Sequence, residues 1–132
     1  MNVITTSTRY SDILKVIIPQ NQRFFKKWYI ITHPNDQDTI NVVKDFNYPN
    51  IELVLFNFYE NGKIFNKGGA IRSIQKIIPS GTPVLLLDSD IYLPDNFLNV
   101  IPTIENDKLY SSDKRYYFYT RKALLENIWP RY

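Results

Sequence analysis

The sequence contains no cysteine, a single histidine and no apolar run long enough to span a membrane. Without cysteine, the chain can form no disulfide and no thiolate metal site. A single histidine excludes a His-rich zinc site. The N-terminus also lacks a signal-peptide pattern, so we expect a cytoplasmic protein without a transmembrane segment.

Strong charge of one sign is also missing. The net charge of the 132 residues is +3, and acidic residues are spread among the basic ones. Nucleic-acid binding predicts a strong basic stripe, so we do not expect nucleic acid as a partner. A mild positive charge suits an anionic small molecule. With 44% apolar residues, we expect one domain with a real hydrophobic core over residues 1–132.

Short apolar runs alternate with segments of helical periodicity along the chain. Strands are predicted at residues 2–6, 28–32, 51–56, 84–87, 108–111 and 115–120. Helices are predicted at residues 10–21, 36–46, 66–78, 95–100 and 121–127. This alternation predicts an α/β fold with a mostly parallel sheet and the strand at 84–87 inside it. Ligands of such sheets bind beyond the carboxyl ends of the strands.

Two carboxylates, Asp88 and Asp90, directly follow the apolar run at residues 84–87. Burying unpaired negative charge is costly, so we expect a cation beside them. Mn²⁺ and Mg²⁺ prefer oxygen ligands of this kind, often completed by substrate phosphates. The alternative interpretation is a turn that ends the strand, helped by Ser89 and Pro94.

The run Asn66-Lys67-Gly68-Gly69 opens the helix predicted at residues 66–78. Two glycines allow a ligand to approach the backbone closely, and the N–H groups of a helix N-terminus favour an anion. With Lys67 beside them, they predict a diphosphate site. The alternative is a tight turn whose glycines let the helix pack on the sheet.

The loop after the second predicted strand carries His33 and Asp36. Either side chain could contact a nucleobase. The alternatives are a solvated His33 and an Asp36 that caps the following helix by accepting backbone N–H bonds.

Four segments, residues 3–7, 28–36, 65–70 and 86–94, follow one another in an order that resembles the GT-A glycosyltransferases. In particular, the chain is similar to the small family-2-like transferases carried by large DNA viruses and phages. This resemblance implies a Rossmann-type three-layer sandwich that is short at its C-terminal end. It also implies a nucleotide-sugar donor and Mn²⁺ or Mg²⁺ as cofactor, in the host cytoplasm for a viral protein.

The resemblance also assigns site residues. Asp90 would be the main metal ligand, and Asp88 would complete the metal site by contacting the ribose or a metal-bound water. Thr5 and Thr6 would lie near the nucleoside, and His33 or Asp36 near the base. The donor site implied in this way comprises Thr5, Thr6, His33, Asp36, Asn66, Lys67, Gly68, Gly69, Asp88 and Ser89.

The expected function is transfer of a sugar from the nucleotide-sugar to a hydroxyl of a glycan, protein or small-molecule acceptor. The chain departs from the family in carrying His33 where an acid is common, and in its short C-terminal part. A second chain could complete the acceptor site, and we expect this chain alone to bind the donor but to transfer the sugar weakly or not at all. Asp113 is the candidate base, ahead of Glu105 and Asp107.

Two other functions are compatible with these residues. One is an inactive domain that binds a nucleotide-sugar without transferring the sugar. The other is a nucleotidyltransferase, which the absence of glycine from the loop at residues 5–12 disfavours.

Overall fold

A computed structural model describes residues 1–62, 64–101, 103–105, 107–112, 120 and 122. At its centre is an all-parallel sheet with the strand order β3-β2-β1-β4. The strands are β1 (Asn2–Thr6), β2 (Lys27–Thr32), β3 (Ile51–Leu55) and β4 (Val84–Leu86). The predicted α/β class and the parallel sheet are therefore confirmed, and the arrangement is Rossmann-like.

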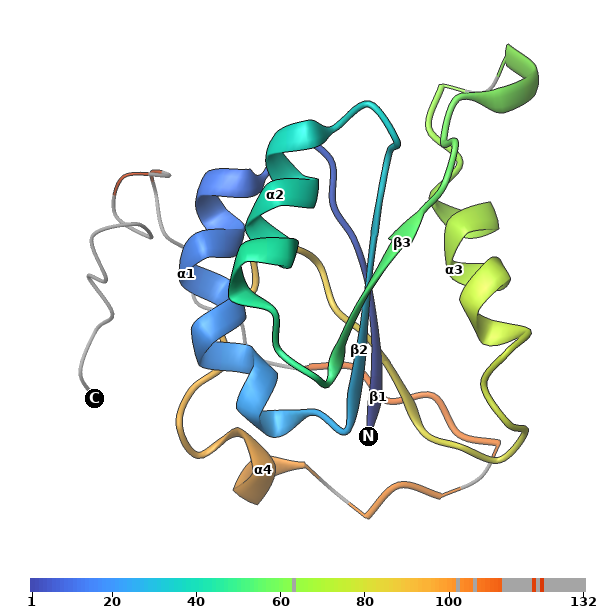
Figure 1. The fold of residues 1–132 in the computed structure, drawn as a ribbon. Coiled ribbons are helices and arrows are strands. Elements are labelled where there is room, and N and C mark those ends of the chain that lie inside the picture. Colours follow the sequence, from blue (N-terminus) through green and yellow to red (C-terminus); the bar gives the residue numbers. More distant parts are fainter. Residues whose placement is uncertain (63, 102, 106, 113–119, 121, 123–132) are drawn as a thin grey trace.

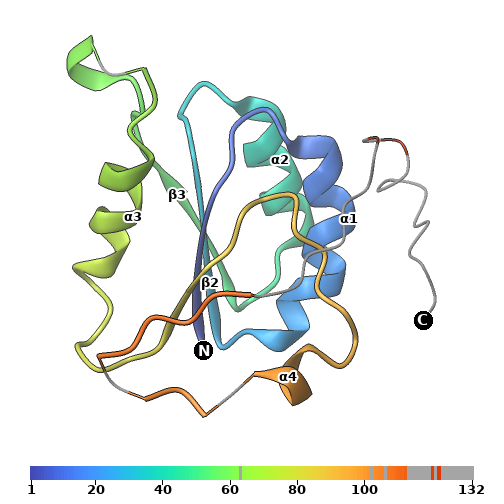
Figure 2. The same cartoon turned by 180° about the vertical axis from the view of Figure 1, so that it is seen from behind.

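Helices cover both faces of the sheet (Figures 1 and 2). On one face lie α1 (Ser11–Asn21) and α2 (Gln37–Phe46), and on the other lies α3 (Lys67–Gln75). The short α4 (Phe97–Val100) follows β4, and two 3-10 turns are formed by η1 (Gln22–Phe24) and η2 (Glu60–Gly62). The amino ends of the strands point to the bottom of Figure 1 and their carboxyl ends to the top.

The central strands are apolar on both faces because helices cover both. Ile30 and Ile31 are adjacent in β2 and fully buried, and they belong to separate core clusters on opposite faces. Trp28 is also fully buried, and its indole N–H donates to Thr5 Oγ1 at 2.9 Å. Such runs are typical of parallel strands buried between two helix layers.

The position of β4 corrects one expectation. In the described part of the chain β4 pairs with β1 alone and forms an edge of the sheet, so the prediction that it lies inside is wrong. Helix α3 packs over β1, and Leu86 remains 54% exposed. An apolar run predicts a strand, but its sequence does not say how many neighbours the strand has.

A second correction concerns residues 108–111, which form no strand. Local contacts organise this region instead. The Tyr110 hydroxyl donates to Thr103 O at 3.3 Å and accepts from the Glu105 N–H at 3.3 Å, and Lys108 pairs with Glu105. These contacts are made by the side chains of Lys108 and Tyr110, and the backbone of residues 108–111 takes part in no strand ladder.

Other C-terminal predictions cannot be compared. The strand expected at 115–120, the helix expected at 121–127 and Asp113 lie outside the described residues, apart from Thr120 and Lys122. Within the described part, none of the helices has the length and hydropathy required to cross a bilayer.

Candidate functional site

Two of the sequence motifs meet at the carboxyl edge of the sheet. Lys67 begins α3 and Asp88 follows β4, and Lys67 Nζ lies 2.6 Å from Asp88 Oδ1. Their side chains are 48% and 64% exposed, so this ion pair adds at most about 1 kcal/mol to stability. Both charged groups are therefore accessible to a ligand.

The N-terminus of α3 is built by Asn66. Its side-chain Oδ1 accepts the Gly69 N–H at 3.0 Å, which caps the helix. A Cβ on Gly69 would lie 2.3 Å from Asn66 Nδ2, so any other residue at this position would displace the capping side chain. A Cβ on Gly68 would meet nothing within 4 Å. Packing between the described residues therefore does not explain Gly68, whereas close approach of a ligand would.

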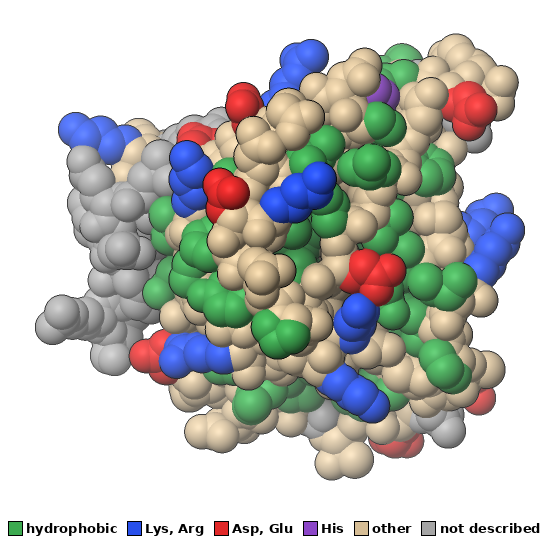
Figure 3. All heavy atoms as spheres, in the orientation of Figure 1, with side chains coloured by type: hydrophobic (Ala, Val, Ile, Leu, Met, Phe, Trp, Pro, Cys, Tyr) green, Lys and Arg blue, Asp and Glu red, His purple; other side chains and the backbone are tan. Residues whose placement is uncertain are grey.

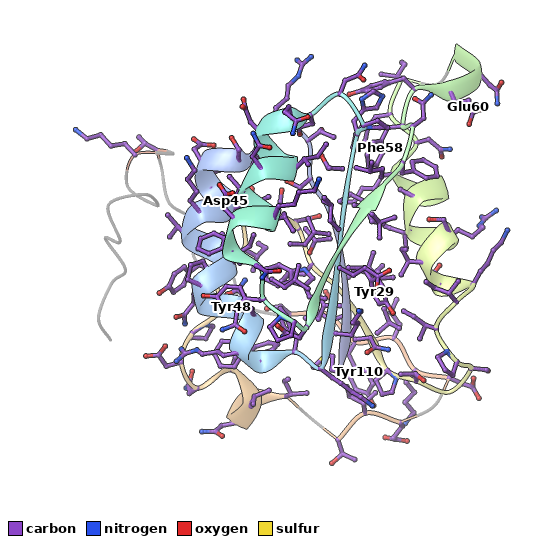
Figure 4. The ribbon with its side chains drawn as sticks, viewed as in Figure 1. Tyr29, Asp45, Tyr48, Phe58, Glu60 and Tyr110 are labelled. Atoms are coloured by element: carbon purple, nitrogen blue, oxygen red, sulfur yellow. The ribbon has the colours of Figure 1, made fainter. Side chains whose placement is uncertain are left out.

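The loop between β3 and α3 returns the chain to this helix start. Phe58 is fully buried and stacks on Phe65, with ring centroids 4.6 Å apart and an interplanar angle of 8°. The Asn66 N–H donates to Phe58 O at 2.8 Å, which closes the base of the loop. Figure 4 labels Phe58 near the sheet and Glu60 on the part that projects beyond it.

A polar cavity of about 320 Å³ opens at the same end of the molecule, next to β1 and β2. The rings of His33 and Tyr59 form one part of its wall, with centroids 5.4 Å apart. His33 Nδ1 accepts the Asn35 N–H at 3.1 Å. The cavity is lined by Thr8, Arg9, His33, Asn35, Asp36, Gln37, Asp38 and Tyr59.

Sequence reasoning missed Arg9 and Tyr59 as cavity residues. Tyr59 follows β3 in an aromatic run, and its position depends on the stacking of Phe58 on Phe65. Arg9 enters the wall through an unusual backbone with a φ of 63°. The sequence indicated Arg9 as a cavity residue only by its position after the first strand, because a positive φ at arginine has no sequence signature.

Asp36 joins three segments around this cavity. Its Oδ1 accepts the Thr39 N–H at 3.3 Å, so the predicted helix cap is present. Its Oδ2 accepts the Arg9 N–H at 2.7 Å and the Thr32 hydroxyl at 3.1 Å. Burial raises the pKa of Asp36, but these hydrogen bonds outweigh it and the net pKa is lowered.

This lowered pKa predicts how stability depends on pH. A carboxyl whose folded pKa lies below its unfolded pKa adds stability above the unfolded value, and that stability is lost as pH falls through the folded value. We expect Asp36→Asn to lower the free energy of unfolding by about 1 kcal/mol at pH 7, because its amide nitrogen cannot accept the two hydrogen bonds that Oδ2 accepts. The difference should shrink below about pH 4.

Urea unfolding of the wild type and Asp36→Asn between pH 7 and pH 3 measures this difference. Asp45→Asn is the matched control, because Asp45 is an exposed carboxylate on the same helix (Figure 4). A difference for Asp36→Asn that stays constant over this range would contradict the role assigned to the charge.

The remaining predicted residues differ in accessibility. Thr5 is fully buried, its hydroxyl is used by Trp28, and it does not line the cavity. Thr6 is half-buried, and Ser89 is buried between the two exposed carboxylates Asp88 and Asp90. The contacts with a nucleoside that the resemblance implies for Thr5 and Thr6 stay predictions.

Asp88 and Asp90 lie on a turn in which the Ile91 N–H donates to Asp88 O at 3.3 Å. Among the described residues, no third His, Cys, Asp or Glu joins them to form a complete protein ligand set. Two exposed carboxylates nevertheless fit Mg²⁺ or Mn²⁺, because these ions usually keep waters and bind through one or two carboxylates plus substrate phosphates.

Charges of both signs are interspersed over the face in Figure 3, and they form no continuous basic surface on that face. Comparisons of the chain with models of protein families, with curated proteins and with solved structures found no match.

Proposed function

We propose that this chain binds a nucleotide-sugar at the carboxyl edge of its sheet and transfers the sugar to a hydroxyl acceptor, as a GT-A-like glycosyltransferase. The observation that carries the proposal is the contact between Lys67 and Asp88. It joins the N-terminus of α3 to the Asp88-Ser89-Asp90 turn, at the carboxyl edge of the sheet where the polar cavity also opens.

The nucleoside would occupy the cavity. Its volume of about 320 Å³ lies within the range of small-molecule pockets, and its walls combine aromatic rings with polar side chains. The rings of His33 and Tyr59 offer apolar surface to a planar base. Asp38, Gln37 and Asn35 supply hydrogen-bonding groups at its rim.

The diphosphate would lie over the start of α3. Gly68 leaves its backbone open to close approach, and the helix N-terminus favours negative charge. Lys67 would exchange its ion pair with Asp88 for a phosphate oxygen when the donor binds. In the free protein, the same ion pair provides the Asp88 carboxylate with a positive partner.

Asp88 and Asp90 would hold Mn²⁺ or Mg²⁺ together with the oxygens of the diphosphate. When bound, such an ion offsets the negative charge of the leaving nucleoside diphosphate. Lys67 adds a second positive charge to the same group, which stabilises the charge that develops as the bond to the sugar breaks. The proton of the acceptor hydroxyl needs a base, and Asp113 remains the candidate.

Release of nucleoside diphosphate from a panel of nucleotide-sugars tests this function. With Mn²⁺, we expect release from one donor of the panel, faster with an acceptor hydroxyl than without one. Lys67→Ala should slow release at least tenfold, because it removes one positive charge from the leaving group. Lys44→Ala changes an exposed lysine of α2 and is the matched control.

The outcomes separate the proposed function from its alternatives. Binding without release under any condition would support a binding domain and overturn transfer. Release of sugar 1-phosphate in place of nucleoside diphosphate, by cleavage between the two phosphates, would support a nucleotidyltransferase.

A further inference from the structure

The segment that follows the Asp88-Ser89-Asp90 turn is held by the end of α1. Residues 91–96 form neither strand nor helix, so their backbone groups need partners from elsewhere. Asn21 supplies two of them. Its Nδ2 donates to Ile91 O at 2.8 Å, and its Oδ1 accepts the Leu93 N–H at 3.0 Å.

Asn21 is fully buried, which makes both hydrogen bonds costly to lose. The side chain donates one hydrogen bond to this segment and accepts one from it, as the backbone of a neighbouring strand would. Leu93 is buried in the core cluster that also contains Leu87. The segment is therefore fixed between the sheet and α1 by polar and apolar contacts together.

Neighbouring side chains extend the same contact to the surface. Gln20 Nε2 donates to Leu93 O at 2.8 Å and to Asp95 Oδ1 at 3.0 Å, and Arg23 pairs with Asp95. The two contacts with Asp95 are exposed, so they contribute less than the buried amide of Asn21.

The turn is thus anchored on both sides. Before it, the Leu87 N–H donates to Ile4 O of β1 at 3.0 Å. After it, Ile91 O is held by Asn21. Only Asp88, Ser89 and Asp90 lie between these two anchors. The position of the Asp90 carboxylate therefore depends on a residue of α1 that does not itself touch the site.

We propose that Asn21 is a positioning residue for the carboxylates of Asp88 and Asp90, and that it sets their affinity for a divalent cation. This inference rests on the proposed function only for the role of the cation. The placement of the turn by Asn21 can be measured in the free protein.

Asn21→Leu removes both hydrogen bonds at similar side-chain volume, and Asn21→Ala removes both by truncation. Asn50→Ala is the matched control. The Asn50 side chain donates to Gln22 O at 2.8 Å and to Phe25 O at 3.0 Å, so it also holds backbone carbonyls but not those of residues 88–93. It corrects for a general loss of stability.

The first measurement is amide hydrogen exchange of the free protein. We expect Asn21→Leu to speed amide exchange of residues 88–93 at least tenfold relative to Asn50→Ala. Each variant is measured at the same number of degrees below its own melting temperature. The second is Mn²⁺ affinity by electron paramagnetic resonance, which should fall at least tenfold in the same variant. Asn21→Ala should change both quantities in the same direction, and it serves as the test if Asn21→Leu does not fold.

Unchanged exchange in residues 88–93 would overturn the inference, as would Mn²⁺ affinity equal to that of Asn50→Ala. If the wild type binds no Mn²⁺ while the exchange of residues 88–93 rises as expected, the positioning of the turn is supported and the proposed function loses its metal site.

Discussion

Asp90→Asn is expected to lower Mn²⁺ affinity at least tenfold. Loss of a group that only hydrogen-bonds to a metal ligand already lowers affinity by about tenfold to a hundredfold. Asp90 is exposed on the turn after β4, and Asp88 is the one other carboxylate of that turn. With so few protein ligands, removal of one charge leaves a neutral amide oxygen that binds a hard cation poorly.

Electron paramagnetic resonance of free Mn²⁺ in the presence of a nucleoside diphosphate measures this loss. Asp45→Asn makes the same change of charge on α2, away from the turn, and should leave the affinity within about twofold (Figure 4). Equal losses in the two variants would mean that only the net charge of the protein matters. The assignment of Asp90 as a ligand would then be wrong.

Alanine at Gly68 and at Gly69 is expected to separate binding from stability. Gly68→Ala meets no neighbour within 4 Å, and alanine favours a helix over glycine, so the variant should be more stable by up to about 1 kcal/mol. It should nevertheless bind a nucleoside diphosphate about tenfold more weakly, because its Cβ lies where the diphosphate would approach the first turn of α3.

Gly69→Ala gains the same helix preference but displaces the Asn66 cap, since its Cβ would lie 2.3 Å from Asn66 Nδ2. Loss of a cap costs about 1 kcal/mol, so this variant should be less stable than Gly68→Ala by about that amount. Thermal unfolding and calorimetric titration of both variants measure the two effects. A stable Gly68→Ala that binds like the wild type would exclude contact of the diphosphate with Gly68.

The sheet could be predicted from the sequence because the apolar runs and the helices alternate regularly. β1 has the predicted bounds, and β2 and β3 each differ from theirs by one residue. The meeting of Lys67 and Asp88 followed from the same pattern, since parallel strands bring the loops after their carboxyl ends to one edge. The caps formed by Asp36 and Asn66 were predictable from residue type at a helix start.

Features that depend on long-range packing could not be predicted. The edge position of β4 depends on which strand lies beside it, and Leu86 carries no signal of that. Tyr59 reaches the cavity through the stacking of aromatic rings within its loop. The two hydrogen bonds of Asn21 join residues about 70 positions apart, beyond the reach of any local pattern.

The proposed site comprises the cavity, the start of α3 and the Asp88-Ser89-Asp90 turn, which together would bind a metal-bound nucleoside diphosphate. Its most direct test is calorimetric titration of the wild type with uridine, guanosine, adenosine and cytidine diphosphates, with Mn²⁺ and with chelator. We predict that one of these binds at least tenfold more tightly with Mn²⁺, because the ion links its phosphates to the carboxylates. Absence of binding to all four, or equal affinity in both conditions, would contradict the account.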